Sequence, residues 1–322
     1  MRIVITGATG NVGTSVVQAL LGGDHEIVGI ARRRPTEEVP GVQWISADVT
    51  TTDLVPLFAG ADAVVHLAWL IQPSHEPDVL WRTNVVGTTR VIEAVAAAGV
   101  PRLVHASSVG TYAQAPKDRR VDESHPTDGI PTLGYSWQKA YCERLLDRFE
   151  REHPEVAVVR MRPALIFKAD AAHEIRQLFL GPLVPTRLLA PGAVRRLIDR
   201  SPIAFQCLHS LDAGRAYALA AASDVRGPFN IAAEPPLGQL RAAPPKAFVA
   251  PVRLLAGAAW RSRIVRASPG WIDLAAAAPI MDTTRAHREL GWTPTRDAHE
   301  TLTELLEGLR SDTRGTTPPL SS

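Results

Sequence analysis

The sequence predicts an α/β protein built on a doubly wound parallel sheet, with a smaller second lobe towards the C-terminus. Short β-branched runs that are typical of buried strands alternate with amphipathic helical stretches over the first half of the chain. The first run, residues 2–6, passes through a glycine-spaced turn directly into a helical stretch. After Pro163 the pattern changes, because proline and glycine interrupt short apolar runs. We therefore expect that lobe to be discontinuous.

The elements of the sheet domain follow in order. We expect strands at residues 2–6, 26–31, 42–46, 63–67, 102–106 and 156–161, and helices at 16–21, about 77–98 and 135–152. The second of these helices ends at Gly99, which suits the position after a helix C-cap, with Pro101 just beyond. A polar loop is expected at 114–132.

The domain boundaries follow from the same pattern. Residues 1–165 are expected to form the sheet domain, and 202–232 to return to it through strands at 203–208 and 229–231. Residues 166–201 and 233–310 are expected to form the second lobe, which closes with a helix at 298–309. The Ser/Thr/Pro composition of residues 311–322 predicts a disordered tail.

Composition excludes several classes of function. The 322 residues are 45% hydrophobic and 21% charged, with a formal net charge of +2 and no long block of like charges. Neither a nucleic acid nor a membrane surface is therefore an expected partner. Cys142 and Cys207 lie outside any metal-ligand spacing, so no metal site is expected. No run of about 18 apolar residues occurs, and the first strand leaves no room for a signal peptide, so we expect a cytoplasmic protein.

The turn after the first strand predicts a dinucleotide site. Its glycines follow a G-x-x-G-x-x-G spacing, in which Gly7 takes the tight turn, Gly10 lets a pyrophosphate approach the backbone and Gly13 lets the helix pack on the strand. The helix N-terminus offers unpaired N–H groups to the phosphates. The sheet domain is thus expected to be of the Rossmann type, with cofactor contacts from Gly7, Thr9, Gly10, Asn11, Val12 and Gly13.

Chemically active side chains occur where later strands end. Ser107 and Ser108 close the fifth expected strand, and Asn84 lies within the long helix. Tyr135 and Lys139 are four residues apart at the start of the next helix, which places both on one helical face. In open α/β sheets, ligands bind at the carboxyl ends of the strands.

The chain resembles the extended short-chain dehydrogenase/reductase superfamily, and within it the NAD-dependent epimerase/dehydratase family. Motifs typical of that family occur in order along nearly the whole chain. They are Thr6-Gly7-Ala8-Thr9-Gly10-Asn11-Val12-Gly13, Asp48-Val49, His66-Leu67-Ala68, Asn84-Val85-Val86-Gly87-Thr88, Ser107-Ser108-Val109-Gly110-Thr111-Tyr112, Tyr135-Ser136-Trp137-Gln138-Lys139, Arg162-Pro163, His209 with Asp212, Met281-Asp282-Thr283 and Leu290-Gly291-Trp292-Thr293-Pro294.

The resemblance implies a catalytic triad of Ser108, Tyr135 and Lys139. A free tyrosine has a pKa near about 10, and both the Lys139 ammonium and an oxidised nicotinamide would favour its phenolate. Tyr135 would exchange a proton with the substrate oxygen, and Ser108 would hydrogen-bond to that oxygen. Ser108 is preferred to Ser107 because it lies four residues before Tyr112, as in the family. The alternative is an ordinary surface Tyr and Lys pair beside a strand-end serine.

Further cofactor contacts are carried over from the family. Asp48 and Val49 would bind the adenine, although an Asx-turn or helix cap is the alternative for Asp48. Asn84 and Lys139 would hold the nicotinamide ribose or the active-site helix, and a plain helix-surface role is the alternative for Asn84. His66 is expected to be scaffolding. The motif after the fourth strand adds two residues that would lie beside the cofactor, Leu67 and Ala68.

The end of the second strand favours NADP over NAD. An acid at this place binds the ribose 2′-hydroxyl of NAD, whereas arginine accommodates a 2′-phosphate. Here Ala31 stands where the acid would fall, and Arg32 and Arg33 follow. NADP is therefore expected, and NAD remains possible if the arginines only decorate the turn.

Two departures from the family pattern bear on the substrate. Leu165 stands where relatives that act on nucleotide sugars often have Asn, and Leu211 replaces an Asp. The second lobe is rich in Leu, Ala, Pro and Trp. We favour an NAD(P)-dependent oxidoreductase acting on a small or hydrophobic carbonyl or alcohol. A nucleotide-sugar epimerase or dehydratase with recycled NAD and a nucleotide-sensing protein are the alternatives. By resemblance, a homodimer through the helices of Asn84 and Tyr135 is expected.

Overall fold

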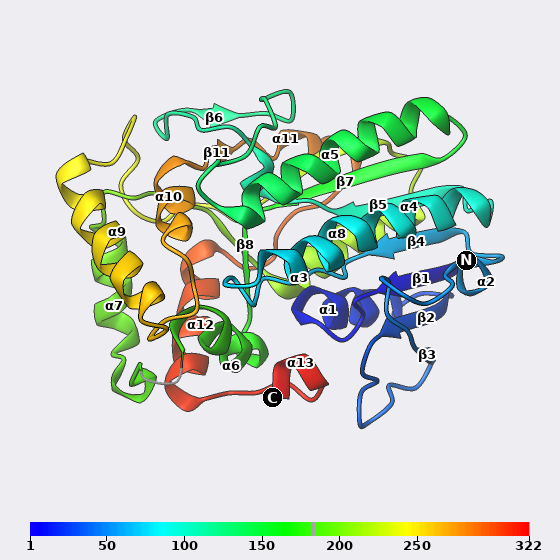
Figure 1. The fold of residues 1–322 in the computed structure, drawn as a ribbon, viewed down its shortest axis with the longest axis horizontal. Coiled ribbons are helices and arrows are strands. Elements are labelled where there is room, and N and C mark those ends of the chain that lie inside the picture. Colours follow the sequence, from blue (N-terminus) through cyan, green and yellow to red (C-terminus); the bar gives the residue numbers. More distant parts are fainter. Residues whose placement is uncertain (182–183, 322) are drawn as a thin grey trace.

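The computed structural model describes residues 1–181 and 184–321, and a seven-stranded parallel sheet forms its centre (Figure 1). The spatial order is β10-β7-β5-β4-β1-β2-β3. The order reverses beside β1, whose two neighbours are β2 and β4, so a crevice at the carboxyl ends is expected there. The strands are β1 (Arg2–Thr6), β2 (Glu26–Ala31), β3 (Val42–Ser46), β4 (Ala63–His66), β5 (Arg102–Ala106), β7 (Ala157–Pro163) and β10 (Gly227–Ile231).

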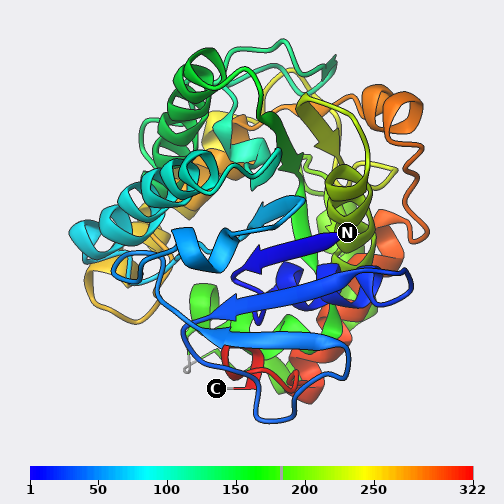
Figure 2. The same ribbon diagram turned by 90° about the vertical axis from the view of Figure 1, so that its right-hand side faces the viewer.

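Helices cover both faces of this sheet, as the turned view shows (Figure 2). Side chains alternate along β1, so Ile3 and Ile5 belong to one core and Val4 to the other. The first core packs against α1 (Asn11–Leu20), α8 (Ser210–Ala222) and α12 (Ala298–Ser311). The second packs against α2 (Val55–Phe58), α4 (Gly87–Ala97) and α5 (Gly134–Glu152). The predicted doubly wound sheet is confirmed.

The long helix expected at about 77–98 forms as three consecutive segments. These are α3 (Pro77–Trp81), the π-helical turn η1 (Arg82–Val86) and α4. Asn84 lies in the π-helical turn, a feature that frequently accompanies functional sites. The polar loop expected at 114–132 contains one short strand, β6 (Arg120–Val121), and the 3-10 turn η2 (Val109–Thr111) precedes it.

The second lobe lies at one end of the sheet domain (Figure 1). Of the two segments expected to rejoin the main sheet, β10 does so, but β9 (Cys207–His209) pairs with β8 (Leu165–Phe167) in a separate two-stranded sheet. In the main sheet, β10 takes the place beside β7. The other elements after β8 are η3 (Ala169–Ala171), α6 (Ala172–Ile175), η4 (Arg176–Leu180), η5 (Thr186–Leu188), α7 (Pro191–Asp199), α9 (Lys246–Arg261), α10 (Gly270–Ala277), β11 (Ile280–Met281) and α11 (Thr284–Glu289).

The C-terminal tail differs from the disordered segment expected at 311–322. After α12, residues 312–321 pack on the domain and end in the short helix α13 (Pro318–Ser321). Leu320 is only 2% exposed, and the Thr317 hydroxyl donates to the carbonyl of Thr9 over 2.7 Å. One buried leucine and this hydrogen bond anchor a segment whose composition alone is typical of disorder; Ser322 lies outside the described residues.

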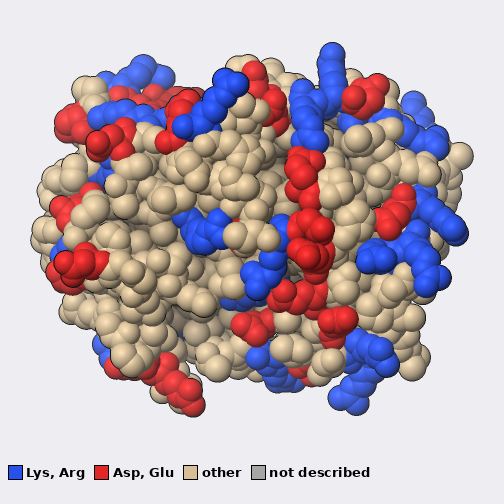
Figure 3. Space-filling view, turned by 180° about the vertical axis from the view of Figure 1, so that it is seen from behind, with Lys and Arg blue, Asp and Glu red and all other residues tan. Residues whose placement is uncertain are grey.

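Acidic and basic side chains are interspersed on the face drawn in Figure 3. In the described part of the chain, no helix has both the length and the apolar character that a membrane crossing requires.

Candidate active site

The glycine-spaced turn brings backbone N–H groups to the carboxyl end of β1. Gly7 has a φ of +75°, and a Cβ there would lie 2.7 Å from the backbone nitrogen of Ala68. A Cβ on Gly13 would lie 2.2 Å from the Gly7 oxygen, so both positions require glycine. A Cβ on Gly10 would make an ordinary contact of 3.5 Å with the Gly7 oxygen. No side chain caps α1 and no acid lies in its first turn, so its N-terminus is available to an anion.

A cavity lies at these carboxyl ends, beside the reversal in strand order. Nine of the predicted cofactor contacts line it, and Trp69, Leu70, Thr83, Glu174 and Pro319 complete much of its wall. The indole nitrogen of Trp69 is buried there without a hydrogen-bond partner. An elongated polar cofactor therefore fits this donor set, with its phosphates at α1. The nine are Gly7, Thr9, Gly10, Arg32, Arg33, Asp48, Val49, Leu67 and Ala68.

The remaining predicted contacts do not line this cavity. Asn11 and Val12 begin α1, and the Asn11 amide donates to the carbonyl of Ile166 over 3.3 Å. Gly13 packs beneath the turn. Asn84 and Lys139 are buried, and Tyr135 is half-buried next to Trp69 and Trp271.

The end of β2 places positive charge at one side of the cavity. Arg32 and Arg33 are both exposed and line it next to Asp48. The Asp48 carboxylate accepts the backbone N–H of Thr50 at 2.8 Å and its hydroxyl at 2.7 Å, which is the Asx-turn considered above. Burial opposes ionisation, but these hydrogen bonds and Arg32 hold the pKa of Asp48 below its ordinary value. Asp48 thus serves the turn while it borders the cavity.

Tyr135, at the start of α5, faces the strand-end serine. The Tyr135 ring and the Ser108 Oγ both lie beside Gly110, whose backbone N–H donates to that Oγ over 3.0 Å. Two indoles flank the phenol, with ring centroids 5.9 Å away for Trp69 and 5.1 Å away for Trp271. Burial raises the pKa of Tyr135, and the Ser108 side chain opposes that rise. At neutral pH these surroundings favour the neutral phenol.

Lys139 lies one turn along α5 and is buried. Its ammonium donates to the carbonyl of Ala106 over 2.6 Å and lies 3.4 Å from the centroid of the Trp69 ring. The Tyr135 ring centroid is 5.9 Å away. Burial lowers the pKa of Lys139 to about 7. No carboxylate of the described residues forms an ion pair with it, so this ammonium is held beside the tyrosine by a carbonyl and an aromatic face.

The sequence of this chain is similar to that of known proteins. Residues 3–232 match the family model described as "NAD dependent epimerase/dehydratase family". The chain belongs to this family. An L-arabinose 1-dehydrogenase (NAD(P)(+)) of Haloferax volcanii is 30% identical over 232 residues, which cover 66% of this chain and 89% of that protein. The family supports an NAD(P) cofactor for the cavity described above.

Two further likenesses extend over nearly the whole chain. An uncharacterized protein of Mycobacterium tuberculosis is 28% identical over 321 residues, which cover 96% of this chain but only 30% of that protein. The chain thus spans less than a third of the length of this relative. The structure of a Thermus thermophilus UDP-glucose 4-epimerase with NAD has a TM-score of 0.67 at 20% identity and covers 96% of this chain and 99% of its own. That likeness shows the shared fold.

In this family member, Asn84 and His66 hold the site together. The Asn84 amide accepts the N–H of Leu70 and donates to the Leu70 carbonyl and to Gln138 of α5, at 2.7, 2.8 and 2.8 Å. Asn84 therefore joins the loop after β4 to the active-site helix, one of the two roles considered for it. His66 is buried between the hydroxyls of Thr6 and Thr88, and burial lowers its pKa to about 3. It remains a neutral scaffold residue.

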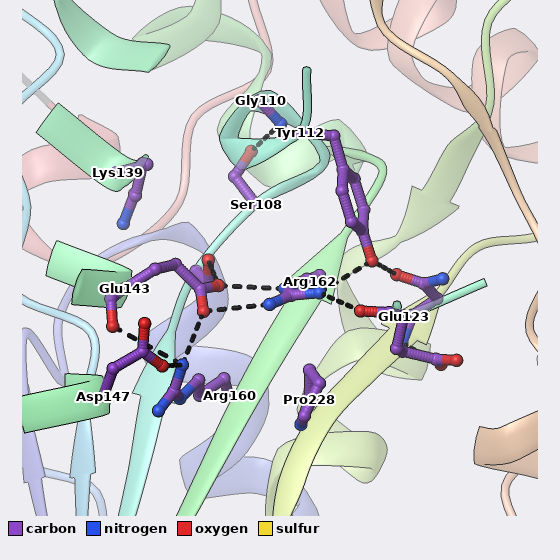
Figure 4. A network of polar contacts seen from close by, with 12 residues as sticks. Ser108, Gly110, Tyr112, Glu123, Lys139, Glu143, Asp147, Arg160, Arg162 and Pro228 are labelled. Carbon is purple, nitrogen blue, oxygen red and sulfur yellow. Dashed lines mark hydrogen bonds and ion pairs between the residues drawn. The ribbon is translucent and has the colours of Figure 1, made fainter. Parts of the chain in front are cut away.

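A buried ion network lies near Ser108 and Lys139 (Figure 4). Glu143 of α5 accepts two hydrogen bonds from Arg162, each of 2.9 Å, one from Arg160 at 3.1 Å and one from Ser107 at 2.6 Å. Burial opposes ionisation, but the arginines hold the pKa of Glu143 below its ordinary value. Arg162 also donates to the Tyr112 hydroxyl over 3.0 Å. Ser107 thus serves this network, whereas Ser108 is directed to Tyr135.

Sequence reasoning missed several residues of the site. Trp69 follows the His66-Leu67-Ala68 motif directly, so an aromatic side chain at that place was the available signal. Glu174 also lines the cofactor cavity, and burial raises its pKa to about 7. Neither Glu174 nor Pro319 carried a signal, because their segments reach the cavity only through tertiary packing.

Proposed function

We propose that this protein is an NADP-dependent oxidoreductase of the extended short-chain dehydrogenase type. Its substrate would be a small or hydrophobic carbonyl compound or the corresponding alcohol. Ser108, Tyr135 and Lys139 would form the catalytic triad. The observation that carries the substrate class is a second, largely apolar cavity, one wall of which is Trp271, the indole that packs on Tyr135.

The wall of this cavity favours an apolar substrate over a nucleotide sugar. Val109, which follows Ser108, and Trp271, which packs on Tyr135, both line it. Leu165, where nucleotide-sugar enzymes often have Asn, is part of the same wall. No guanidinium among the described lining residues is available to a diphosphate. The remaining apolar members are Ala164, Phe205, Leu274, Ala275, Ala278 and Pro279.

The protonation states support the reductive direction. A phenol with a raised pKa retains its proton at neutral pH, so Tyr135 would protonate the oxygen of a bound carbonyl. Ser108 lies with Tyr135 beside Gly110 and would orient the same oxygen. Lys139 would supply positive charge beside the tyrosine. A bound nicotinamide supplies the hydride in such reactions.

The preference for NADP rests on the end of β2. Arg32 and Arg33 line the cofactor cavity, and Ala31 offers no carboxylate to a ribose 2′-hydroxyl. NAD is the alternative, because Asp48 also borders this end of the cavity.

A nucleotide-sugar epimerase with recycled NAD is the second candidate. The fold shared with the Thermus thermophilus UDP-glucose 4-epimerase favours it, as does the family to which the chain belongs. The apolar cavity wall argues against it.

A homodimer is part of the proposal. Trp137 and Tyr141 are exposed on α5 and pack around Trp81 of α3, with ring centroids 5.6 and 5.1 Å from it. Exposed aromatic clusters of this kind are typical of protein interfaces. Their position on the helices of the site supports association through these helices.

The test is NADPH oxidation in a screen of aliphatic and aromatic aldehydes and ketones, with UDP-glucose epimerisation measured in parallel. Tyr135→Phe is expected to reduce turnover of any active carbonyl by about 10²-fold or more. Tyr141→Phe, an exposed tyrosine on the same helix, is the matched control and is expected to retain activity. Full turnover by Tyr135→Phe, or epimerisation without carbonyl reduction, would contradict the proposal.

A further inference from the structure

A buried lysine lines the apolar cavity proposed for the substrate. Lys117 is only 2% exposed and lines the same cavity as Val109 and Trp271. Trp271 in turn packs on Tyr135. Its ammonium donates to the carbonyls of Ala204 and Ala275 over 2.6 and 2.7 Å. An ammonium has three N–H donors, so these two bonds leave one for a ligand.

No acid balances this charge. In the described part of the chain, no carboxylate forms an ion pair with Lys117, and burial alone lowers its pKa to about 8. By contrast, the buried Arg160 and Arg162 both contact Glu143. A buried charge without a partner is costly, and such groups are typical of functional sites. An anion brought by a ligand would supply the missing partner.

The other residues that line this cavity limit the kind of molecule that can carry this anionic group. Gln206, the other polar side chain of this cavity, is occupied by Glu234 and by both backbone groups of Met281. All further lining residues are apolar. A single carboxylate on an apolar body fits one free ammonium N–H, whereas a diphosphate would leave most of its oxygens unpaired.

We propose that Lys117 binds the carboxylate of the substrate, and that the substrate is a small apolar oxo acid. This inference rests on the proposed carbonyl reduction. The carboxylate would lie on Lys117, the apolar segment against Trp271, Leu274 and Phe205, and the carbonyl oxygen at Ser108 and Tyr135. The carbonyl carbon would gain hydride from the reduced nicotinamide nucleotide and the oxygen would gain the Tyr135 proton, giving a hydroxy acid and the oxidised nucleotide.

The test compares oxo acids with their uncharged methyl esters. The probes are 4-oxo-4-phenylbutanoate and 5-oxo-5-phenylpentanoate, each beside its ester. Binding is measured by calorimetry with NADPH-loaded Tyr135→Phe, and turnover with the unaltered chain. We expect at least one acid to bind and react about tenfold better than its ester, because the ester lacks the charge that pairs with Lys117.

Variants assign this preference to one side chain. Lys117→Met should bring the acid-to-ester ratio close to one, and Lys117→Arg should retain part of the preference. Lys246→Met, an exposed lysine of α9, is the matched control and should leave the ratio unchanged. Each ratio is measured within one variant, so a general loss of stability does not alter it. If Lys117→Met fails to fold, the acid-to-ester ratio of the unaltered chain decides.

The outcomes separate this inference from the proposed function. Preferential binding of an acid without turnover would support the role of Lys117 and contradict carbonyl reduction. Equal affinity for acid and ester, no binding by any acid, or a preference unchanged in Lys117→Met would overturn the inference, even if other carbonyl compounds are reduced.

Discussion

Buried arginines and buried lysines have different surroundings in this molecule. Beneath α5, Arg160 and Arg162 share Glu143, and Arg160 also contacts Asp147. The chain has only four lysines, and Lys117, Lys139 and Lys168 are buried with no ion-pair partner among the described residues. The arginines connect α5 to β7, whereas each lysine lies beside a place proposed for a ligand. Pairing thus distinguishes the arginines that join α5 to β7 from the lysines that we propose to serve ligands.

The position of each lysine supports this division. Lys168 donates to the Thr14 hydroxyl over 2.6 Å on the first turns of α1, near the proposed phosphate site. Lys139 lies beside Tyr135, and Lys117 lies at the substrate cavity. Lys117 and Lys139 thus lie at the proposed substrate cavity and triad, and Lys168 contacts the helix that begins at the proposed phosphate site.

The largest expected effect comes from removing the carboxylate that pairs the buried arginines. Glu143→Gln removes the carboxylate shared by two buried arginines and should lower the free energy of unfolding by about 3–5 kcal/mol. Urea denaturation measures it. Glu152→Gln, which removes the exposed partner of Arg148, is the control and should cost less than about 1 kcal/mol. Equal small losses would show that the buried network does not stabilise the fold.

Lys139→Met should raise the free energy of unfolding and, at the same time, reduce catalytic turnover. The isosteric apolar side chain avoids burying an unpaired charge, so we expect a gain of about 1–4 kcal/mol near pH 6. Turnover of a carbonyl found in the screen should fall by about 10²-fold or more, because the charge beside Tyr135 is lost. A variant that is less stable and fully active would contradict the assignment.

The pH dependence of this gain has a defined sign. The pKa of Lys139 is about 7 in the folded chain and close to its ordinary, higher value when unfolded. Below pH 7 both states are charged, and the full burial penalty applies. As pH rises above 7, only the unfolded state retains the proton, so the folded state of the unaltered chain becomes relatively more stable. The advantage of Lys139→Met should therefore shrink from pH 7 to 9 in urea titrations.

A smaller effect concerns the exposed cations at the cofactor cavity. Replacing Arg32 and Arg33 together by Ala should weaken NADPH binding by about 10- to 100-fold and change NADH binding little, because only NADPH has a 2′-phosphate. Fluorescence titration of each nucleotide measures the ratio. Equal losses for both would remove the argument for NADP.

Much of the site was predictable because its signals are local in the sequence. The glycines of the first turn, and the four-residue spacing of Tyr135 and Lys139, lie within single elements whose type the hydrophobic pattern shows. Their side chains lie where the strand-end rule of α/β sheets places them.

The residues that were missed depend on contacts between distant segments. Lys117 belongs to a polar loop, and it is buried only because Ala204 and Ala275 come from elsewhere in the chain. The tail was expected to be disordered, yet Thr317 reaches Thr9 across nearly the whole sequence. Composition does not report such packing, so neither feature had a signal in the sequence.

The most direct test of the central claim is the nicotinamide nucleotide that purified protein releases on denaturation, quantified per chain and by type. An NADP-dependent reductase exchanges its cofactor in every cycle, so we expect little retained nucleotide and reversible NADPH binding on titration. Near-stoichiometric NAD would contradict the account, because it would indicate an enzyme that recycles a tightly held cofactor, as an epimerase or dehydratase does.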